Sequence, residues 1–144
     1  VLEIKGVSPD GKWLIVYSFD SSKKGQEGKS QALLAYPIAG GKAVRIWGNS
    51  SMVRWAPDGK RVYMTGHFAG STAGGIGNNY SFPLPPGAML PDIPPTGFSS
   101  EDEMARYPGA RVIDAADIAP GPTPEIYAFS KETTQRNLFR IPVR

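Results

Sequence analysis

The sequence predicts an all-β protein made of about three four-stranded propeller blades, the last one incomplete, with one short helix near 99–107. Three observations favour this fold class. The hairpin segment at 8–17, SPDGKWLIVY, returns 48 residues later at 56–65 as APDGKRVYMT. A repeat of about 40 to 45 residues is typical of propeller blades. The composition, with 17 Gly and 14 Pro among 144 residues, fits many short strands joined by tight turns.

The first unit, residues 1–49, has the pattern of a complete four-stranded antiparallel blade. Pro9-Asp10-Gly11 predicts the first turn, because proline presets φ, Asp bonds the backbone ahead and glycine accepts a positive φ. The run from Trp13 to Tyr17 is apolar on both faces, as in a strand that lies between neighbouring sheets. We expect strands at 2–6, 12–19, 31–38 and 42–47, and a polar loop at 20–30.

The second unit, residues 50–98, repeats the first three strands but has no clear fourth one. We expect strands at 52–55, 61–68 and 80–84, with a turn at Pro57-Asp58-Gly59 and a glycine-rich loop at 69–79. Six prolines then occur between 83 and 95. Because proline lacks the amide donor of a strand ladder, this stretch can contain only edge or irregular strand.

The third unit, residues 99–144, begins with the predicted helix. Ser100 and Glu103 have the spacing of a capping box, and Pro108-Gly109 is a stop signal. The helix near 99–107 is expected to turn Met104 and Tyr107 toward the sheet.

One or two inner strands, a second strand and a third are expected after the helix, and no fourth strand. We expect inner strands at 111–113 and around Ile118, a degenerate turn at Pro120-Gly121-Pro122, a second strand at 126–129 and a third at 137–143. Closed propellers usually have about 4 to 8 blades. The chain is therefore expected to be a single fragment, 1–144, of a longer protein, or to complete itself by association. The missing strand would come from before Val1, from residues 1–5 or from another copy.

Composition and charge exclude several classes of function. The net charge of +3 is spread along the chain, with Lys23-Lys24 and Lys60-Arg61 as the only basic doublets, so we expect no nucleic-acid partner. The absence of cysteine removes disulfides, thiol catalysis and cysteine-based metal sites. No apolar run reaches the length of a membrane span, so we expect no direct span in this chain.

The two Pro-Asp-Gly-Lys units, Ser8 to Trp13 and Trp55 to Lys60, resemble the TolB-like, WD-like β-propeller repeats of bacterial proteins. The match covers 1–68 well and 110–144 loosely. Segments such as Phe82 to Gly87 and Gln135 to Pro142 also look like the C-terminal end of large bacterial proteins that join a serine/threonine kinase domain to a propeller. The resemblance implies a periplasmic or extracytoplasmic part of a membrane-anchored parent, with a cytoplasmic location as the alternative. The kinase motifs are absent, so it implies no kinase residue here.

Candidate ligand or partner contacts are few and lie around the second glycine-rich loop. His67, the only histidine, is expected at a strand end beside this loop, and Asn78, Asn79 and Tyr80 follow it. The loop lacks the Gly-Lys-Ser/Thr ending of a phosphate cradle, so its glycines are interpreted as backbone freedom. A strand-end polar residue is the structural alternative for His67.

Two carboxylate groups and the aromatic residues receive structural interpretations. Glu101-Asp102-Glu103 fits the first turn of a helix, and Asp114 with Asp117 lacks the pattern of a calcium loop. The tryptophans and tyrosines are expected to pack between sheets, with Trp47 as a candidate exception at a strand end. We expect no catalytic, cofactor-binding or metal-ligating residue, and no bound cofactor.

The sequence therefore favours a non-enzymatic propeller module for protein or ligand binding or sensing, as part of a larger, kinase-linked bacterial protein. One alternative is a wall segment of a propeller hydrolase or peptidase-associated enzyme, which a charged pocket near His67, Arg54 or Arg45 would favour. The other is a structural oligomerisation domain. The open blade edges are expected to meet the rest of the parent propeller or another copy. Function is expected in the segments that differ between units: 20–30, 69–79 and 85–109.

Overall fold

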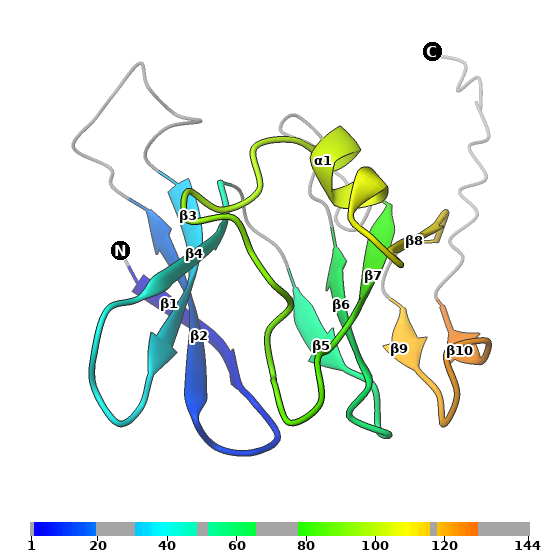
Figure 1. Cartoon of the computed structure of the whole chain (residues 1–144), viewed down its shortest axis with the longest axis horizontal. Coiled ribbons are helices and arrows are strands. Elements are labelled where there is room, and N and C mark those ends of the chain that lie inside the picture. Colours follow the sequence, from blue (N-terminus) through cyan, green and yellow to red (C-terminus); the bar gives the residue numbers. More distant parts are fainter. Residues whose placement is uncertain (1, 20–30, 49–51, 66–77, 116–117, 130–144) are drawn as a thin grey trace, which may run out of the picture.

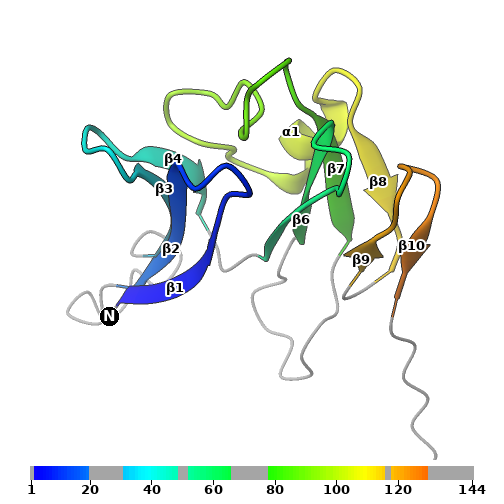
Figure 2. The same cartoon turned by 90° about the horizontal axis from the view of Figure 1, so that it is seen from below.

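The computed structural model describes residues 2–19, 31–48, 52–65, 78–115 and 118–129. These residues form three open antiparallel sheets of four, four and two strands with one short helix (Figure 1). The three sheets follow one another in chain order across the molecule (Figure 2). The prediction of a mostly β chain with a single short helix is confirmed.

The first sheet contains β1 to β4 in the order of the sequence. Its strands are β1 (Leu2–Val7), β2 (Trp13–Phe19), β3 (Gln31–Pro37) and β4 (Val44–Trp47). Each strand pairs antiparallel with the next. All four predicted strands of the first unit are confirmed.

The second sheet also has four strands in sequence order, but its fourth strand comes from an unexpected place. Its strands are β5 (Val53–Trp55), β6 (Arg61–Thr65), β7 (Asn79–Pro83) and β8 (Arg111–Ile113). The prediction that 111–113 is an inner strand of the third unit is wrong, because β8 pairs antiparallel with β7. The second sheet therefore extends beyond residue 98, with 84–110 inserted before its last strand.

The third sheet is a hairpin of β9 (Ala119–Pro120) and β10 (Tyr127–Ala128). The turn predicted at 120–122 is displaced along the chain. Pro120 ends β9, and the reverse turn is closed by the N–H of Ile126, which donates to the carbonyl of Thr123 at 3.0 Å. The predicted strand at 137–143 lies outside the described residues.

One backbone hydrogen bond marks the same hairpin in all three sheets. Ser8 N–H donates to Trp13 C=O at 2.8 Å, Ala56 N–H to Arg61 C=O at 2.9 Å, and Gly121 N–H to Ile126 C=O at 2.8 Å. The bond thus recurs after 48 residues and then after 65, and the longer interval contains the segment 84–110. In the first two hairpins the predicted Asp turns are confirmed, since Asp10 and Asp58 each accept the N–H two residues ahead at 3.0 Å.

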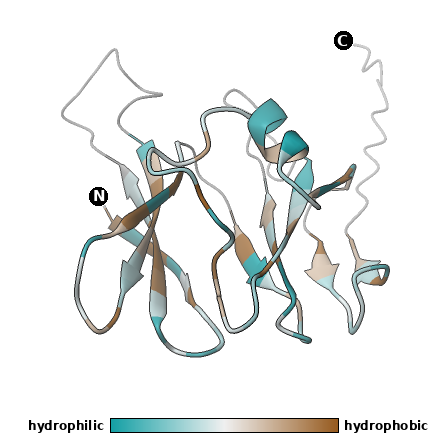
Figure 3. Ribbon diagram, viewed as in Figure 1, coloured by the Kyte–Doolittle hydropathy of each residue, from teal (hydrophilic) through white to brown (hydrophobic). Residues whose placement is uncertain are grey.

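The main hydrophobic core lies between the first and second sheets, where apolar strands face one another (Figure 3). Side chains alternate between the faces of a strand, so each sheet offers one set to this core. Its fully or nearly fully buried members are Ile15, Leu33, Ala35, Ile46 and Trp47 from the first sheet, and Val62, Met64, Tyr80 and Phe82 from the second. A smaller cluster of Ala56, Tyr63 and Ile118 joins the second and third sheets.

The segment 84–110, hereafter the insertion, distinguishes the second sheet from the first. The β3–β4 connection covers only 38–43, whereas the β7–β8 connection covers the whole insertion. As expected from its prolines, the insertion is irregular except for an isolated parallel bridge of Phe98 to Trp47 and for α1 (Glu101–Arg106), which begins after the N-cap Ser100. Met104 is buried beneath the helix, as predicted.

Candidate functional site

The described part of the chain contains a depression of about 560 Å³ on the insertion, beside α1. Its wall comes entirely from residues between 94 and 108, within the segment that has no counterpart in the first sheet. The lining residues are Pro94, Phe98, Ser99, Ser100, Asp102, Glu103, Arg106, Tyr107 and Pro108. We call this feature the α1 depression.

The apolar side of the α1 depression is formed by two rings that continue the main core. Phe98 stacks on the buried Phe82 with ring centres 5.3 Å apart, and Tyr107 meets Phe82 edge-on at 5.4 Å. Phe98 and Tyr107 also meet edge-on at 6.1 Å. Such aromatic contacts contribute about 0.5–1.5 kcal/mol beyond the burial of area. The rings are therefore held in fixed positions by the second sheet.

The polar side of the depression is organised by the cap of α1. Glu103 N–H donates to the Ser100 hydroxyl at 3.1 Å, and the Glu103 carboxylate accepts the N–H and the hydroxyl of Ser99, both at 2.7 Å. The predicted capping box is thus present, with its return bond on Ser99 in place of Ser100. The Ser99 N–H, followed by the Ser99 hydroxyl, lowers the pKa of Glu103. Next to it, Asp102 and Arg106 are exposed and 3.9 Å apart.

Hydrogen bonds from both four-stranded sheets fasten the insertion. The indole N–H of Trp55 donates to Met89 C=O at 2.8 Å, and Phe98 N–H donates to Ile46 C=O at 2.9 Å. The Tyr80 hydroxyl donates to Glu101 at 2.5 Å. Burial, and then this bond to Glu101, raises the pKa of Tyr80 to about 12. The depression is therefore anchored at the start of the insertion, at its middle and at the helix.

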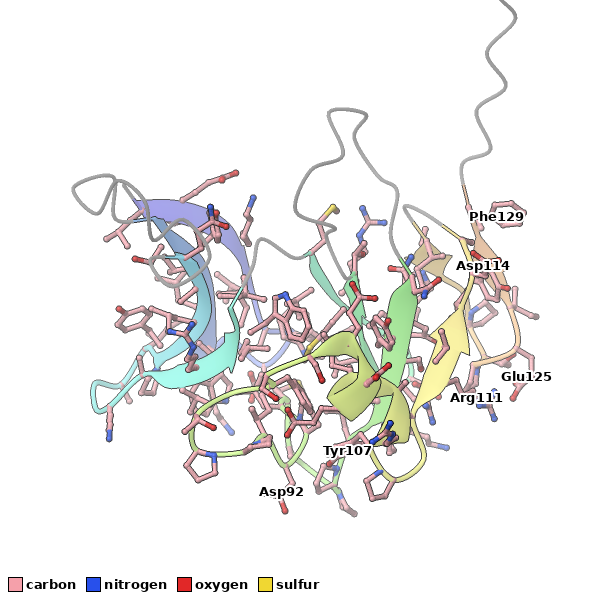
Figure 4. The ribbon with its side chains drawn as sticks, turned by 90° about the horizontal axis from the view of Figure 1, so that it is seen from above. Asp92, Tyr107, Arg111, Asp114, Glu125 and Phe129 are labelled. Carbon is pink, nitrogen blue, oxygen red and sulfur yellow. The ribbon has the colours of Figure 1, made fainter. Side chains whose placement is uncertain are left out.

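A buried arginine fastens the end of the insertion. Arg61 donates to the hydroxyl of Ser81 at 2.6 Å, to Ser81 C=O at 2.7 Å and to Gly109 C=O at 2.8 Å. These partners are neutral oxygens, and burial together with the nearby charge of Arg111 lowers the pKa of Arg61. Arg111 in turn donates to Glu125 at 3.2 Å, so the second and third sheets are joined on the same side (Figure 4).

The residues predicted as ligand contacts do not gather at this depression. His67 lies outside the described residues, and Asn78 is half-buried just before β7. Asn79 is buried, where its amide donates to Ala115 C=O and its oxygen accepts the Thr65 hydroxyl at 2.6 Å. Tyr80 is buried and bonded to Glu101. The polar groups of Asn79 and Tyr80 thus serve internal contacts, and a ligand role for these four residues stays a prediction.

The aromatic and arginine residues singled out in the sequence also make internal contacts. Trp47 is buried in the main core, and Trp13, Tyr17 and Trp55 pack against that core, as expected for most of the aromatic residues. The guanidinium groups of Arg54 and Arg45 donate to the carbonyls of Ile118 and Gln31. Neither arginine lines the depression.

The described residues contain neither a metal-binding cluster nor a membrane-spanning helix. Among them, no group of three or more His, Cys, Asp or Glu side chains is placed to hold a metal ion. The described helix, α1, is too short and too polar to cross a membrane (Figure 3).

No family model, curated protein or solved structure matches this chain. Its site must therefore be interpreted from its own geometry. The α1 depression combines a rigid aromatic and prolyl wall with an ionised carboxylate, an exposed Asp102 and Arg106. Such a surface can accept an aliphatic or prolyl side chain next to a charged one.

Sequence reasoning located the segment of this site but not its residues. The segment 85–109 was expected to carry function because it differs between the units, and the α1 depression lies within it. Phe98 and Tyr107 were not proposed as contacts. The sequence has an aromatic residue on each side of a capped helix in a proline-rich stretch. Such residues can line a surface site or pack in a core, so the pattern alone did not identify them as contacts.

Proposed function

We propose that this chain is a non-enzymatic binding module built of propeller-type blades, and that its α1 depression takes a segment of a partner protein. The observation that carries the proposal is the position of the depression on the insertion, where the second sheet departs from the repeat. Two successive four-stranded meanders and the recurring hairpin bond support the blade interpretation. The resemblance of the turns to TolB-like repeats is in line with it.

The chemistry of the depression favours a short segment with an apolar residue beside a basic one. Tyr107 and the prolines, backed by the buried Phe98, offer flat, rigid contact area of the kind that proline and leucine side chains pack against. Asp102 and Glu103 outnumber Arg106 at the rim, so a lysine or arginine of the partner would be attracted there. The bonds from Ser99 lower the pKa of Glu103, so this attraction, present at neutral pH, also extends below the usual titration range of a glutamate.

The direct test is a titration of the isotope-labelled chain with a synthetic peptide, followed by amide chemical shifts. The peptide Ala-Lys-Pro-Leu-Lys-Ala should shift resonances between 94 and 108, and Ala-Glu-Pro-Leu-Glu-Ala should bind more weakly. Asp102→Lys should weaken binding of the lysine peptide about threefold or more. Asp114→Lys is the matched control, since Asp114 is an exposed carboxylate after β8 and outside the depression (Figure 4).

Two outcomes would contradict the proposal. If neither peptide shifts resonances between 94 and 108, or if both bind equally, the depression does not recognise a basic apolar segment. Turnover of a substrate by this chain alone would contradict its non-enzymatic part.

A further inference from the structure

The face of the first sheet that points away from the second sheet is apolar and exposed. We call it the outer face. Residues opposite one another in paired strands share a face, so the pairs Ile4 with Val16, Val7 with Leu14, and Leu14 with Tyr36 place these side chains together. The exposed large apolar side chains of this face are Ile4 at 69%, Val7 at 49% and Tyr36 at 38%, whereas Leu14 is half-buried and Val16 is buried between them.

The repeat identifies the matching face of the second sheet. Ile38 N–H donates to Lys12 C=O and Leu84 N–H donates to Lys60 C=O, both at 2.8 Å, which puts the two units in the same register. Leu14 pairs with Tyr36, and Val62 pairs with Phe82. The outer face of the first sheet therefore corresponds to the face of the second sheet that carries Val62 and Phe82.

In the second sheet this matching face is covered, and the structure shows what covers it. Val62 and Phe82 are both fully buried in the main core, against the face of the first sheet that carries Ile15, Leu33 and Ala35. The third sheet follows the same rule, because Ile118, directly before β9, is buried in one cluster with Tyr63 on the far side of the second sheet. The second sheet thus uses one face, its receiving face, against the sheet before it and the other, its covering face, against the sheet after it.

The described residues leave one face of each type uncovered. The receiving face that lacks a cover is the outer face of the first sheet. The covering face that lacks a sheet to cover belongs to the third sheet, where Ile126, directly before β10, is 54% exposed. Ile126 occupies the position of Trp13 in the repeated hairpin bond, and Trp13 lies on the covering face of the first sheet. One copy of the chain therefore presents both halves of the contact that joins its own sheets.

We propose that a second copy of this chain covers the outer face with its third sheet, head to tail, so that two copies close a ring of six sheets. A head-to-tail contact closes into a ring when its rotation allows, and six lies within the range of about 4 to 8 blades of known rings. The proposal rests on the blade interpretation given above, while it concerns a surface distant in sequence from the α1 depression. The occupant is a second copy because its third sheet repeats the contact already made inside the molecule.

Sedimentation velocity of the full chain, from low to high micromolar concentration, tests the proposal. The chain should form a dimer, and Val7→Lys should raise the dimer dissociation constant at least about tenfold. Val112→Lys is the matched control. Val112 lies in a strand and is also exposed by 49%, but belongs to β8 of the second sheet. Ile4→Lys provides a second disruption of the outer face should Val7→Lys fold poorly by circular dichroism.

A mixing experiment identifies the head-to-tail arrangement. Ile126→Glu should weaken the dimer as Val7→Lys does, and an equal mixture of the two variants should dimerise more tightly than either alone. The reason is that, when one Val7→Lys chain pairs with one Ile126→Glu chain, one of the two contacts joins an unaltered outer face to an unaltered third sheet. A monomer at all concentrations, or a dimer that resists Val7→Lys and Ile4→Lys, overturns the proposal. A dimer that resists Ile126→Glu overturns the head-to-tail form. Peptide binding at the α1 depression is measured separately and can succeed in either case.

Discussion

Replacing Gly97 by alanine should loosen the join between the insertion and β4, and Gly87 offers a matched control. Both glycines belong to the insertion and have left-handed backbone, with φ of +77° at Gly97 and +74° at Gly87. A Cβ at Gly97 would lie 3.0 Å from the carbonyl oxygen of Arg45 and 3.1 Å from that of Ile46. A Cβ at Gly87 would meet nothing within 4 Å. The two substitutions share the backbone strain and differ in the contact.

The expected losses follow from these two terms. A left-handed conformation costs a residue with a side chain roughly 1–2 kcal/mol, and the reduced freedom of the unfolded chain returns about 0.4–1 kcal/mol. Gly87→Ala should therefore cost about 1 kcal/mol. At Gly97 the Ile46 carbonyl also accepts the N–H of Phe98 at 2.9 Å, and it cannot retreat from a Cβ without weakening that bond. Leaving a buried donor unsatisfied costs about 1–3 kcal/mol, so Gly97→Ala should cost about 2–4 kcal/mol.

Urea unfolding followed by circular dichroism measures both losses in the same host. The midpoint of Gly97→Ala should fall below that of Gly87→Ala, with similar slopes. Because Phe98 forms part of the wall of the α1 depression, Gly97→Ala should also shift the amide resonances of the insertion more than Gly87→Ala does. If the two variants lose equal stability, the contact of Gly97 with β4 has no energetic weight and the reasoning is refuted.

Three further predictions concern the supports of the site. Phe82→Ala should cost about 3–5 kcal/mol of unfolding free energy because Phe82 is fully buried. Phe129→Ala removes an exposed ring and should cost less than about 1 kcal/mol. Equal losses of unfolding free energy in urea would contradict the assigned core. Arg61→Lys should cost about 2 kcal/mol, since an ammonium cannot make the three bonds of the guanidinium, and an unchanged urea midpoint would contradict this. Glu103→Gln should destabilise the chain at neutral pH but not in acid, because the pKa of Glu103 is lower in the folded chain. The stabilisation by the Glu103 carboxylate is therefore present above the unfolded pKa of about 4.3 and is lost as pH falls through the folded pKa. Melting temperatures of both chains between neutral pH and about pH 3 should therefore converge, and a constant difference would contradict the assigned ionisation.

The features that were predicted correctly depend on neighbouring residues. The turns at Pro9-Asp10-Gly11 and Pro57-Asp58-Gly59 were predicted because each residue type has its own backbone preference, and the structure has both turns. The helix was predicted from Ser100 and Glu103 for the same reason. The return bond went to Ser99 because the serine before the cap also offers an N–H and a hydroxyl. Such local contacts are determined by a few consecutive residues.

The pairing of β8 could not be predicted in the same way. Arg111 to Ile113 is too short to carry a strong strand pattern, and its partner β7 lies on the other side of the insertion. What decides the pairing is the return of the insertion to the sheet, where Arg61 donates to Gly109 C=O. That contact joins residues 48 positions apart. The walls of the α1 depression depend on the same long-range contacts, which explains why its segment was expected and its residues were not.

The comparison of the two repeats shows how the sequence accommodates the insertion. When the first two sheets are aligned by their strand pairing, Arg61 occupies the position of Trp13, and Ser81 occupies the position of Ala35. Trp13 and Ala35 belong to the apolar face that covers the second sheet, whereas Arg61 and Ser81 are bonded to each other and Arg61 also holds Gly109. A buried guanidinium is costly without several hydrogen bonds, so the exchange of Trp for Arg requires both the serine and the returning insertion. The polar pair Arg61 and Ser81 on this face and the presence of the α1 depression are therefore linked parts of one departure from the repeat.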